Sequence, residues 1–165
     1  MTTVTFTGNS VPLTGQLPEI NENAPSFSLC GNDLTDITLN QFFGKKVILN
    51  IFPSIDTPVC ANSVIKFNEL ATEHTDIVIL GISADLPFAT SRFNEQNNIE
   101  HVMMASCFRS NEFAKDYGVC IGEGPLSGLT ARAVIVLNEI GQVLYTELVS
   151  EITDAPNYDA ALSVL

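Results

Sequence analysis

The sequence contains few cationic side chains. It has 7 lysines and arginines against 19 aspartates and glutamates, which gives a formal net charge of −12 at pH 7. Nucleic acids and anionic membrane surfaces are bound through clusters of lysine and arginine. The composition therefore argues against nucleic acid and against a membrane surface as partners.

The sequence also lacks a long apolar run. No window approaches the roughly 20 consecutive apolar residues that a membrane-spanning helix requires. Residues 1–6 do not combine a basic region with an apolar stretch, as a secretory signal peptide would. We therefore expect a cytoplasmic protein whose 4 cysteines are reduced thiols at rest.

The chain has no obvious group of metal ligands. Its cysteines lie far apart, at positions 30, 60, 107 and 120, and no two of them form a C-x-x-C motif. Neither His74 nor His101 has a cysteine or carboxylate at the spacing of a metal site. We therefore expect neither a bound metal nor a thioredoxin-type dithiol.

The pattern of apolar residues predicts one α/β domain over residues 1–165. Residues 3–7 and 10–14 alternate around Gly8-Asn9, which predicts an N-terminal β-hairpin. The continuous apolar run at 76–83 is typical of a parallel strand covered on both faces. Further strands are expected at 27–30, 47–52, 99–105, 131–137 and 142–149, and helices at 39–43, 58–74, 85–96, 110–117 and from 154. This order predicts a mixed sheet with helices on both faces, the last two strands forming an antiparallel hairpin.

Cys60 stands at the start of a predicted helix. Thr57 is expected to be the N-cap, with its side-chain oxygen accepting the Cys60 N–H, and Pro58 takes the first helical position. The free N–H groups and the dipole of the first turn favour a thiolate, which is the nucleophilic form of cysteine. A buried, inert cysteine is the more common case. The position after a strand, where open α/β sheets place ligands, favours a reactive one.

Arg132, Pro53 and Thr57 are further candidates for this site, and each has a plain structural alternative. Arg132 opens the strand 131–137, either with its head in solvent or held at the sheet end to stabilise a thiolate. Arg109, beside Cys107, is a weaker candidate for that role. Pro53 either ends its strand or covers the sulfur against water. The Thr57 hydroxyl, besides capping the helix, is placed to donate to a thiolate or a bound oxygen.

The segment 52–60, Phe-Pro-Ser-Ile-Asp-Thr-Pro-Val-Cys, resembles the active-site loop of the bacterial thiol peroxidases, a branch of the peroxiredoxins. Residues 82–89, 124–133 and 156–162 are similar to the same branch, so the resemblance covers nearly the whole chain. It implies a thioredoxin-like fold, a homodimer, and reduction of hydrogen peroxide or organic hydroperoxides without metal, haem or flavin. Carried over by position, it implies Cys60 as the peroxidatic cysteine, with Pro53, Thr57 and Arg132 completing the site.

The family pattern is broken at Asn94. The family usually reads Ser-Arg-Phe-Cys there, and that cysteine resolves the oxidised one, whereas this chain reads Ser-Arg-Phe-Asn at 91–94. Two functions stay open: a peroxidase driven by a thiol reductant, either a thioredoxin-like protein or a small thiol, and a thiol-based sensor or redox-binding protein without efficient turnover. We favour the peroxidase.

Several routes for reducing oxidised Cys60 also stay open. They are direct reduction by an external thiol, an internal disulfide with Cys107, and a bond with Cys120 or with a second subunit. In the family's strand order, Cys107 lies two strands from the strand that leads into Cys60. Two strand spacings amount to about 10 Å, beyond the roughly 4.4–6.8 Å Cα separation of a disulfide. We therefore favour direct reduction.

Overall fold

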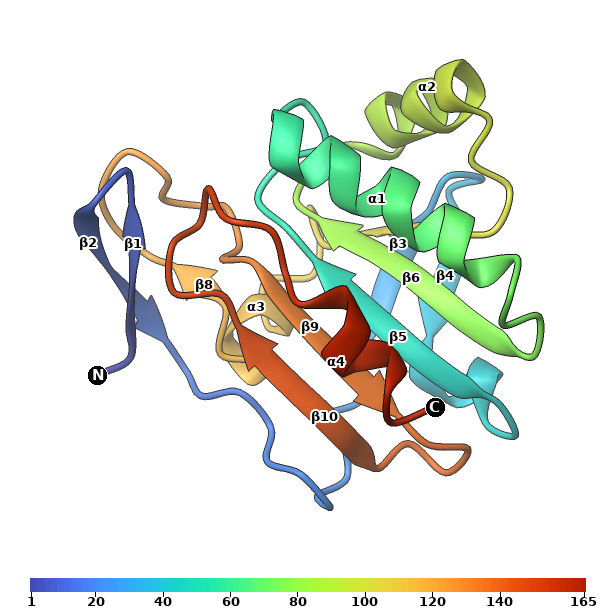
Figure 1. The fold of residues 1–165 in the computed structure, drawn as a ribbon. Helices are drawn as coiled ribbons and strands as arrows, with labels where there is room; N and C mark the ends of the chain where they lie inside the picture. The colour runs from blue at the N-terminus through green and yellow to red at the C-terminus, as the bar shows by residue number, and fades with distance from the viewer.

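The computed structural model describes residues 1–165 (Figure 1). The strands are β1 (Thr3–Phe6), β2 (Asn9–Thr14), β3 (Ser28–Gly31), β4 (Asp36–Thr38), β5 (Lys46–Ile51), β6 (Ile77–Ser83), β7 (Met103–Ser106), β8 (Cys120–Ile121), β9 (Ala133–Leu137) and β10 (Val143–Leu148). The helices are the 3-10 turn η1 (Leu39–Phe42) and α1 (Pro58–Ala71), α2 (Pro87–Asn97), α3 (Phe113–Asp116) and α4 (Tyr158–Leu162). None of these helices has the length and apolar character needed to cross a membrane.

The central sheet has 7 strands in the order β10-β9-β5-β6-β7-β3-β4. Strands β5, β6 and β7 run parallel, and the other neighbours pair antiparallel. A second sheet of 3 strands joins the N-terminal hairpin to β8. The predicted hairpin, the parallel strand at 77–83 and the mixed sheet are confirmed.

The sheet separates two apolar cores. Along β5, Val47, Leu49 and Ile51 pack into one core, while Ile48 and the following Phe52 pack into the other. This alternation is the period-2 pattern of a strand covered on both faces. Helices α1 and α4 lie in front of the sheet in Figure 1 and bury the second core, whereas the hairpin and α3 bury the first.

The predicted strand 99–105 begins too early, because β7 starts only at Met103. Asn98 adopts a left-handed conformation (φ 53°), which ends α2. The N–H groups of Glu100 and His101 then donate to the Asn68 side chain at 3.0 and 2.8 Å. Because these two N–H groups already donate to α1, they are not available for hydrogen bonds between strands.

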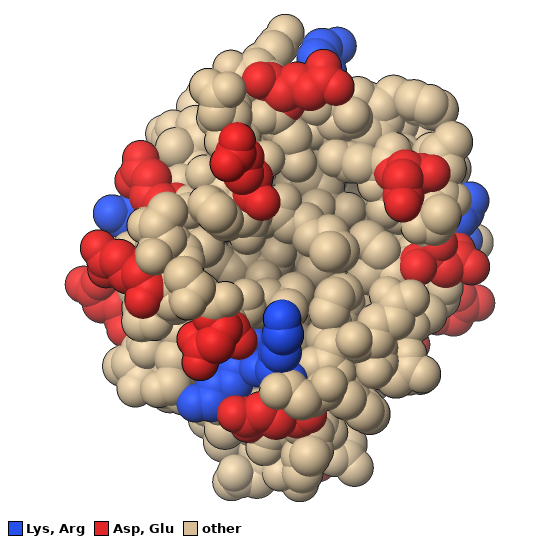
Figure 2. Space-filling view, turned by 90° about the vertical axis from the view of Figure 1, so that its right-hand side faces the viewer, with Lys and Arg blue, Asp and Glu red and all other residues tan.

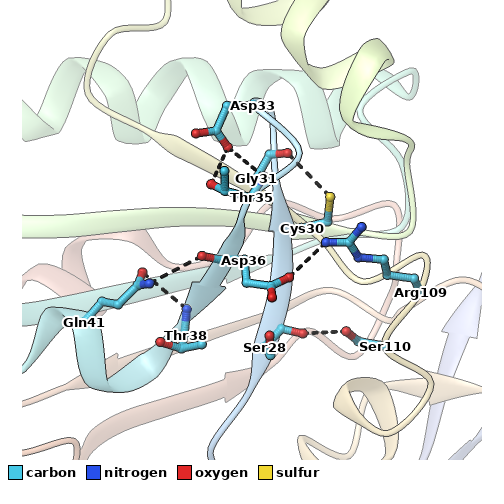
Figure 3. Close-up of polar contacts among 10 residues, drawn as sticks. All are labelled: Ser28, Cys30, Gly31, Asp33, Thr35, Asp36, Thr38, Gln41, Arg109 and Ser110. Carbon is cyan, nitrogen blue, oxygen red and sulfur yellow. Dashed lines mark hydrogen bonds and ion pairs between the residues drawn. The ribbon is translucent and has the colours of Figure 1, made fainter.

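Several helix ends also differ from prediction. Helix α1 ends at Ala71, short of the predicted end at residue 74. Backbone hydrogen bonds between residues three positions apart continue the turn as far as His74. The helix predicted at 110–117 is limited to α3, which begins at Phe113, and the Ser110 hydroxyl before it donates to the Ser28 carbonyl at 2.5 Å (Figure 3). Helix α4 begins at Tyr158 rather than near 154, after Asn157 caps it through Ala160 N.

The surface is acidic, as the composition predicts. In the view of Figure 2, acidic side chains are spread over the rim of the face and cations are few. The ion pairs are Arg92 with Asp56 at 3.9 Å and Arg109 with Asp36 at 2.9 Å, both between exposed side chains. Exposed pairs of this kind contribute at most about 1 kcal/mol, so the fold depends on its two cores.

Candidate active site

The loop that leads from β5 to α1 is fixed by Asp85, which follows β6. One carboxylate oxygen accepts the Ser54 hydroxyl at 2.8 Å. The other accepts the Ile55 N–H and the Ser83 hydroxyl, each at 2.7 Å. The Asp85 carboxylate therefore joins the ends of two neighbouring parallel strands, the edge at which open α/β sheets place ligands. The sequence prediction did not single it out.

Thr57 is the N-cap residue of α1, as predicted, but its side chain does not cap the helix. Its backbone is extended (φ −102°, ψ 146°), and no side-chain bond to the first turn forms. The Thr57 hydroxyl instead donates to the Ser54 carbonyl at 2.9 Å. The predicted bond to the Cys60 N–H is therefore wrong, and no side chain caps the N–H groups of the first turn.

Arg132 contacts the Cys60 sulfur. Its Nη2 lies 3.2 Å from Sγ, and both residues are buried, with Cys60 at 0% and Arg132 at 1% exposure. Nε and Nη2 also donate to the Ile152 carbonyl at 3.1 and 2.9 Å, which fixes the plane of the guanidinium. The alternative with the Arg132 head in solvent is excluded by this geometry.

Arg132 is buried without a carboxylate partner. An uncompensated buried charge is strongly unfavourable, and neither ion pair between basic and acidic side chains involves Arg132. Its polar contacts are instead the Cys60 sulfur and the Ile152 carbonyl. Nη1 is also buried, and neither of its two N–H groups has a partner in the folded chain.

An apolar pocket, the Cys60 pocket, lies beside the first turn of α1; Arg132 lines it, whereas the buried Cys60 does not. Pro53, Thr57 and Arg132 all line it, so the structure brings the three predicted site residues together. The remaining wall is largely hydrophobic and includes Phe6, Pro58, Val59, Leu126, Leu129 and Ile152. The pocket therefore combines an apolar wall with one cationic residue, Arg132.

Arg109 and Arg92 lie elsewhere. Arg109 pairs with Asp36 of the edge strand β4 (Figure 3), so its assignment as a weaker candidate for stabilising the thiolate is wrong. Arg92 is exposed on α2. Cys30 is buried in β3, and its thiol points to the Gly31 carbonyl at 3.6 Å. None of these side chains lines the Cys60 pocket.

Cys107 and Cys120 line a different hollow, together with Lys115. Cys107 belongs to the core on the hairpin side of the sheet, whereas Cys60 belongs to the core under α1. Burial raises the pKa of the Cys107 thiol to about 11, with smaller contributions from Asp85 and Cys120. Cys107 is therefore a protonated, weakly nucleophilic thiol at neutral pH. Cys120 is half-buried in β8, where it pairs with Thr14.

Asn94 lies on α2 and faces the β3–β4 turn. It lines a hollow there with Asn32, Asp33 and Gln41, away from the Cys60 pocket. Its Oδ1 is buried and accepts no hydrogen bond. The side chain at this position is therefore not linked to Cys60 by any contact of the folded chain.

The mixed sheet, its two covered faces and a cysteine in the first turn after β5 define the class of peroxiredoxin-like thiol proteins. A redoxin family profile matches residues 19–162. The thiol peroxidases of Mycobacterium bovis and Mycobacterium tuberculosis are each 50% identical over 165 residues, covering 100% of this chain and 99% of theirs. A peroxiredoxin-like protein from Aquifex aeolicus is 39% identical with a TM-score of 0.92, over 98% of this chain and 94% of that one.

A solved thiol peroxidase from Chromobacterium violaceum shares the fold, with a TM-score of 0.91 at 24% identity, over 98% of this chain and 93% of that one. The chain therefore belongs to the redoxin family, in its bacterial thiol peroxidase branch. The predicted thioredoxin-like fold and family are confirmed by these similarities.

Proposed function

We propose that the protein reduces hydroperoxides at Cys60 with electrons from thiols. The thiolate attacks the terminal oxygen of ROOH, the O–O bond breaks, and the sulfur becomes a sulfenic acid. The departing alkoxide takes up a proton and leaves as ROH, or as water when the substrate is hydrogen peroxide. A first thiol then condenses with the sulfenic acid and releases water, and a second thiol cleaves the mixed disulfide, restoring Cys60.

The contact between Arg132 and Cys60 is the observation that carries this proposal. Nη2 at 3.2 Å stabilises the attacking thiolate, and the unpartnered Nη1 is placed to donate to a peroxide oxygen as charge develops on it. The Thr57 hydroxyl lies at the pocket and is able to turn from the Ser54 carbonyl to the substrate. Pro53 is buried against the pocket, where its ring excludes water.

The apolar wall of the pocket supports organic hydroperoxides as substrates in addition to hydrogen peroxide. Transfer of an alkyl or aryl group from water to such a wall is favourable by about 25 cal/mol per Å² of apolar surface buried. Hydrogen peroxide has no group to place there and relies on the contacts of Thr57 and Arg132 alone. The physiological reductant is a thioredoxin-like protein or a small thiol of the cytoplasm.

Exposed apolar side chains at the start of α2 and just after β7 support a homodimer. Leu86 and Phe88 at the start of α2 are 51% and 68% exposed, and Phe108 is 43% exposed. The Ser106 hydroxyl bonds both Asp85 O and Phe108 N, so the two segments are neighbours. A second copy of the chain would remove these three side chains from water.

A peroxide sensor is the second candidate function, and Asn94 favours it. Without a resolving cysteine on α2, an oxidised Cys60 has time to react with a partner protein. Steady-state consumption of hydroperoxide, with a thioredoxin system or a small thiol supplied, separates the two functions. Oxidation of one equivalent without further turnover would support the sensor and contradict the peroxidase.

Peroxide treatment is expected to leave Cys60 as a sulfenic acid rather than an internal disulfide. Cys60 and Cys107 lie on opposite faces of the sheet, and the high pKa of Cys107 makes it a slow attacking thiol. Intact mass after one equivalent of hydrogen peroxide should show one added oxygen, and a Cys107→Ser variant should behave identically. A stoichiometric Cys60–Cys107 peptide under non-reducing conditions, formed as fast as peroxide disappears, would contradict this prediction.

Asp85→Asn is expected to lower kcat/KM for hydroperoxides about tenfold. The amide replaces one acceptor by a donor, so one of the loop bonds to Ser54, Ile55 or Ser83 is lost and Cys60 is less well placed. Misplacement of a reacting group by about 1 Å has cost about 100-fold in other enzymes. Asp33→Asn is the control, because Asp33 accepts two bonds from Thr35 in a remote turn. Equal kinetics of the two variants would refute a role for Asp85.

A further inference from the structure

Glu151 is a carboxylate that takes no part in the chemistry described so far. It follows β10 and precedes Ile152, whose carbonyl holds Arg132. Five hydrogen bonds reach its two oxygens, from Thr5 Oγ1 (2.6 Å), Gly8 N (3.1 Å), Thr7 N (2.9 Å), Thr153 N (3.3 Å) and Thr153 Oγ1 (2.8 Å). One side chain therefore joins the N-terminal hairpin to the segment after β10.

The turn between β1 and β2 is shaped to receive an anion. Thr7 and Gly8 both have positive φ, 49° and 81°, and their N–H groups both donate to Glu151. Successive N–H groups in a turn of this kind form a concave anion-binding nest. These donors, the Thr5 hydroxyl most of all, lower the pKa of Glu151 to about 2. The carboxylate is therefore charged at every ordinary pH.

The segment that Glu151 holds is also paired to β1 through the backbone. Thr5 N donates to Ser150 O at 2.7 Å, and Ile152 N donates to Thr5 O at 2.8 Å. The carbonyl of Ile152 then accepts both Nε and Nη2 of Arg132. A continuous line of hydrogen bonds runs from the hairpin through residue 152 to the guanidinium that contacts Cys60.

We propose that Glu151 is a positioning residue for this reaction. By holding the Thr7-Gly8 turn, it fixes the Ile152 carbonyl, and that carbonyl directs Nη2 of Arg132 at the Cys60 sulfur. The inference rests on the proposed roles of Cys60 and Arg132. Phe6 and Ile152, on the two segments that Glu151 joins, also line the Cys60 pocket, so the same contact sets the distance between two of its walls.

A double-mutant cycle tests the proposal. The readout is single-turnover oxidation of Cys60 by hydrogen peroxide, quenched at intervals and followed by intact mass. Glu151→Ala is expected to lower the rate constant about fivefold, which corresponds to about 1 kcal/mol. In an Arg132→Met background the same change should cost less than about twofold, because no guanidinium remains to be positioned. Glu139→Ala, at an exposed glutamate of the β9–β10 loop, should leave the rate unchanged.

Equal losses in the two backgrounds would overturn the proposal, because they would show that Glu151 acts on stability alone. No loss in the otherwise native chain would overturn it too. If Glu151→Ala does not fold, Glu151→Gln takes its place, because its amide NH2 would face the donating N–H groups of the Thr7-Gly8 turn. Its loss of rate should again be larger in the native background than in Arg132→Met. A native chain that is not oxidised at Cys60 would contradict the proposed function itself, and this control is read separately from the cycle.

Discussion

Cys60→Ser is expected to abolish hydroperoxide consumption and to keep the fold. A serine hydroxyl is not ionised at neutral pH, so the nucleophile is lost, and removing the nucleophile of an enzyme costs at least about 1000-fold in rate. The hydroxyl still accepts a hydrogen bond from Arg132, so the buried guanidinium keeps a polar partner. Peroxide consumption with a thiol reductant in excess measures the loss, and circular dichroism checks the fold.

Cys107→Ser is the matched control for this prediction. Cys107 is also buried, but it lies in the core on the other face of the sheet. Its substitution should leave the peroxidase rate within about twofold of the native chain, because surface and core changes away from a site act mainly on stability. Retained turnover in Cys60→Ser, or an equal loss in both variants, would place the chemistry elsewhere.

Arg132→Met should lower the rate constant for Cys60 oxidation tenfold to a hundredfold. Methionine keeps the apolar stem of the side chain but removes the donors that reach the sulfur and the Ile152 carbonyl. A hydrogen bond to a charged group is worth about 1.5–3 kcal/mol, and each 1.36 kcal/mol corresponds to about tenfold in rate. Stopped-flow or quenched oxidation with hydrogen peroxide measures the effect.

Arg92→Met provides the comparison. Arg92 is exposed on α2 and pairs with Asp56 at 3.9 Å, a contact worth little in water. Its loss should leave the oxidation rate unchanged. If Arg132→Met and Arg92→Met oxidise equally fast, the contact between the guanidinium and the sulfur has no catalytic value. Alkylation of Cys60 at neutral pH should also be slower in Arg132→Met and unchanged in Arg92→Met, because only the first variant removes the contact to the sulfur.

The parts of the site predicted from sequence are those determined by neighbouring residues. Cys60 was placed in the first turn of α1 from the local order of strand, loop and Pro58, and the structure puts it there. The bonding of the Thr57 hydroxyl was missed, because the Ser54 carbonyl competes for it and only the loop geometry decides. The burial of Arg132 depends on a carbonyl 20 positions further along the chain, which no local pattern reveals.

In the fold, too, features set by neighbouring residues were predicted and features set by distant residues were not. The long apolar strands β5, β6 and β9 were predicted nearly to their ends, since burial on both faces leaves a continuous apolar run. The short strands β4 and β8 were missed because three and two residues carry no periodic signal. Asp85 and Glu151 were not recognised as anchors, because their partners come from other strands and turns.

The contact between a buried guanidinium and a buried sulfur has a consequence for access to the site. Arg132 and Cys60 meet at 1% and 0% exposure, so the folded chain offers no surface of the sulfur to a peroxide or a thiol in solution. The cycle proposed for Cys60 therefore requires the first turn of α1 or the loop before it to open locally, once for the peroxide and once for the reducing thiol. The frequency of that opening then sets an upper limit on the rate of turnover.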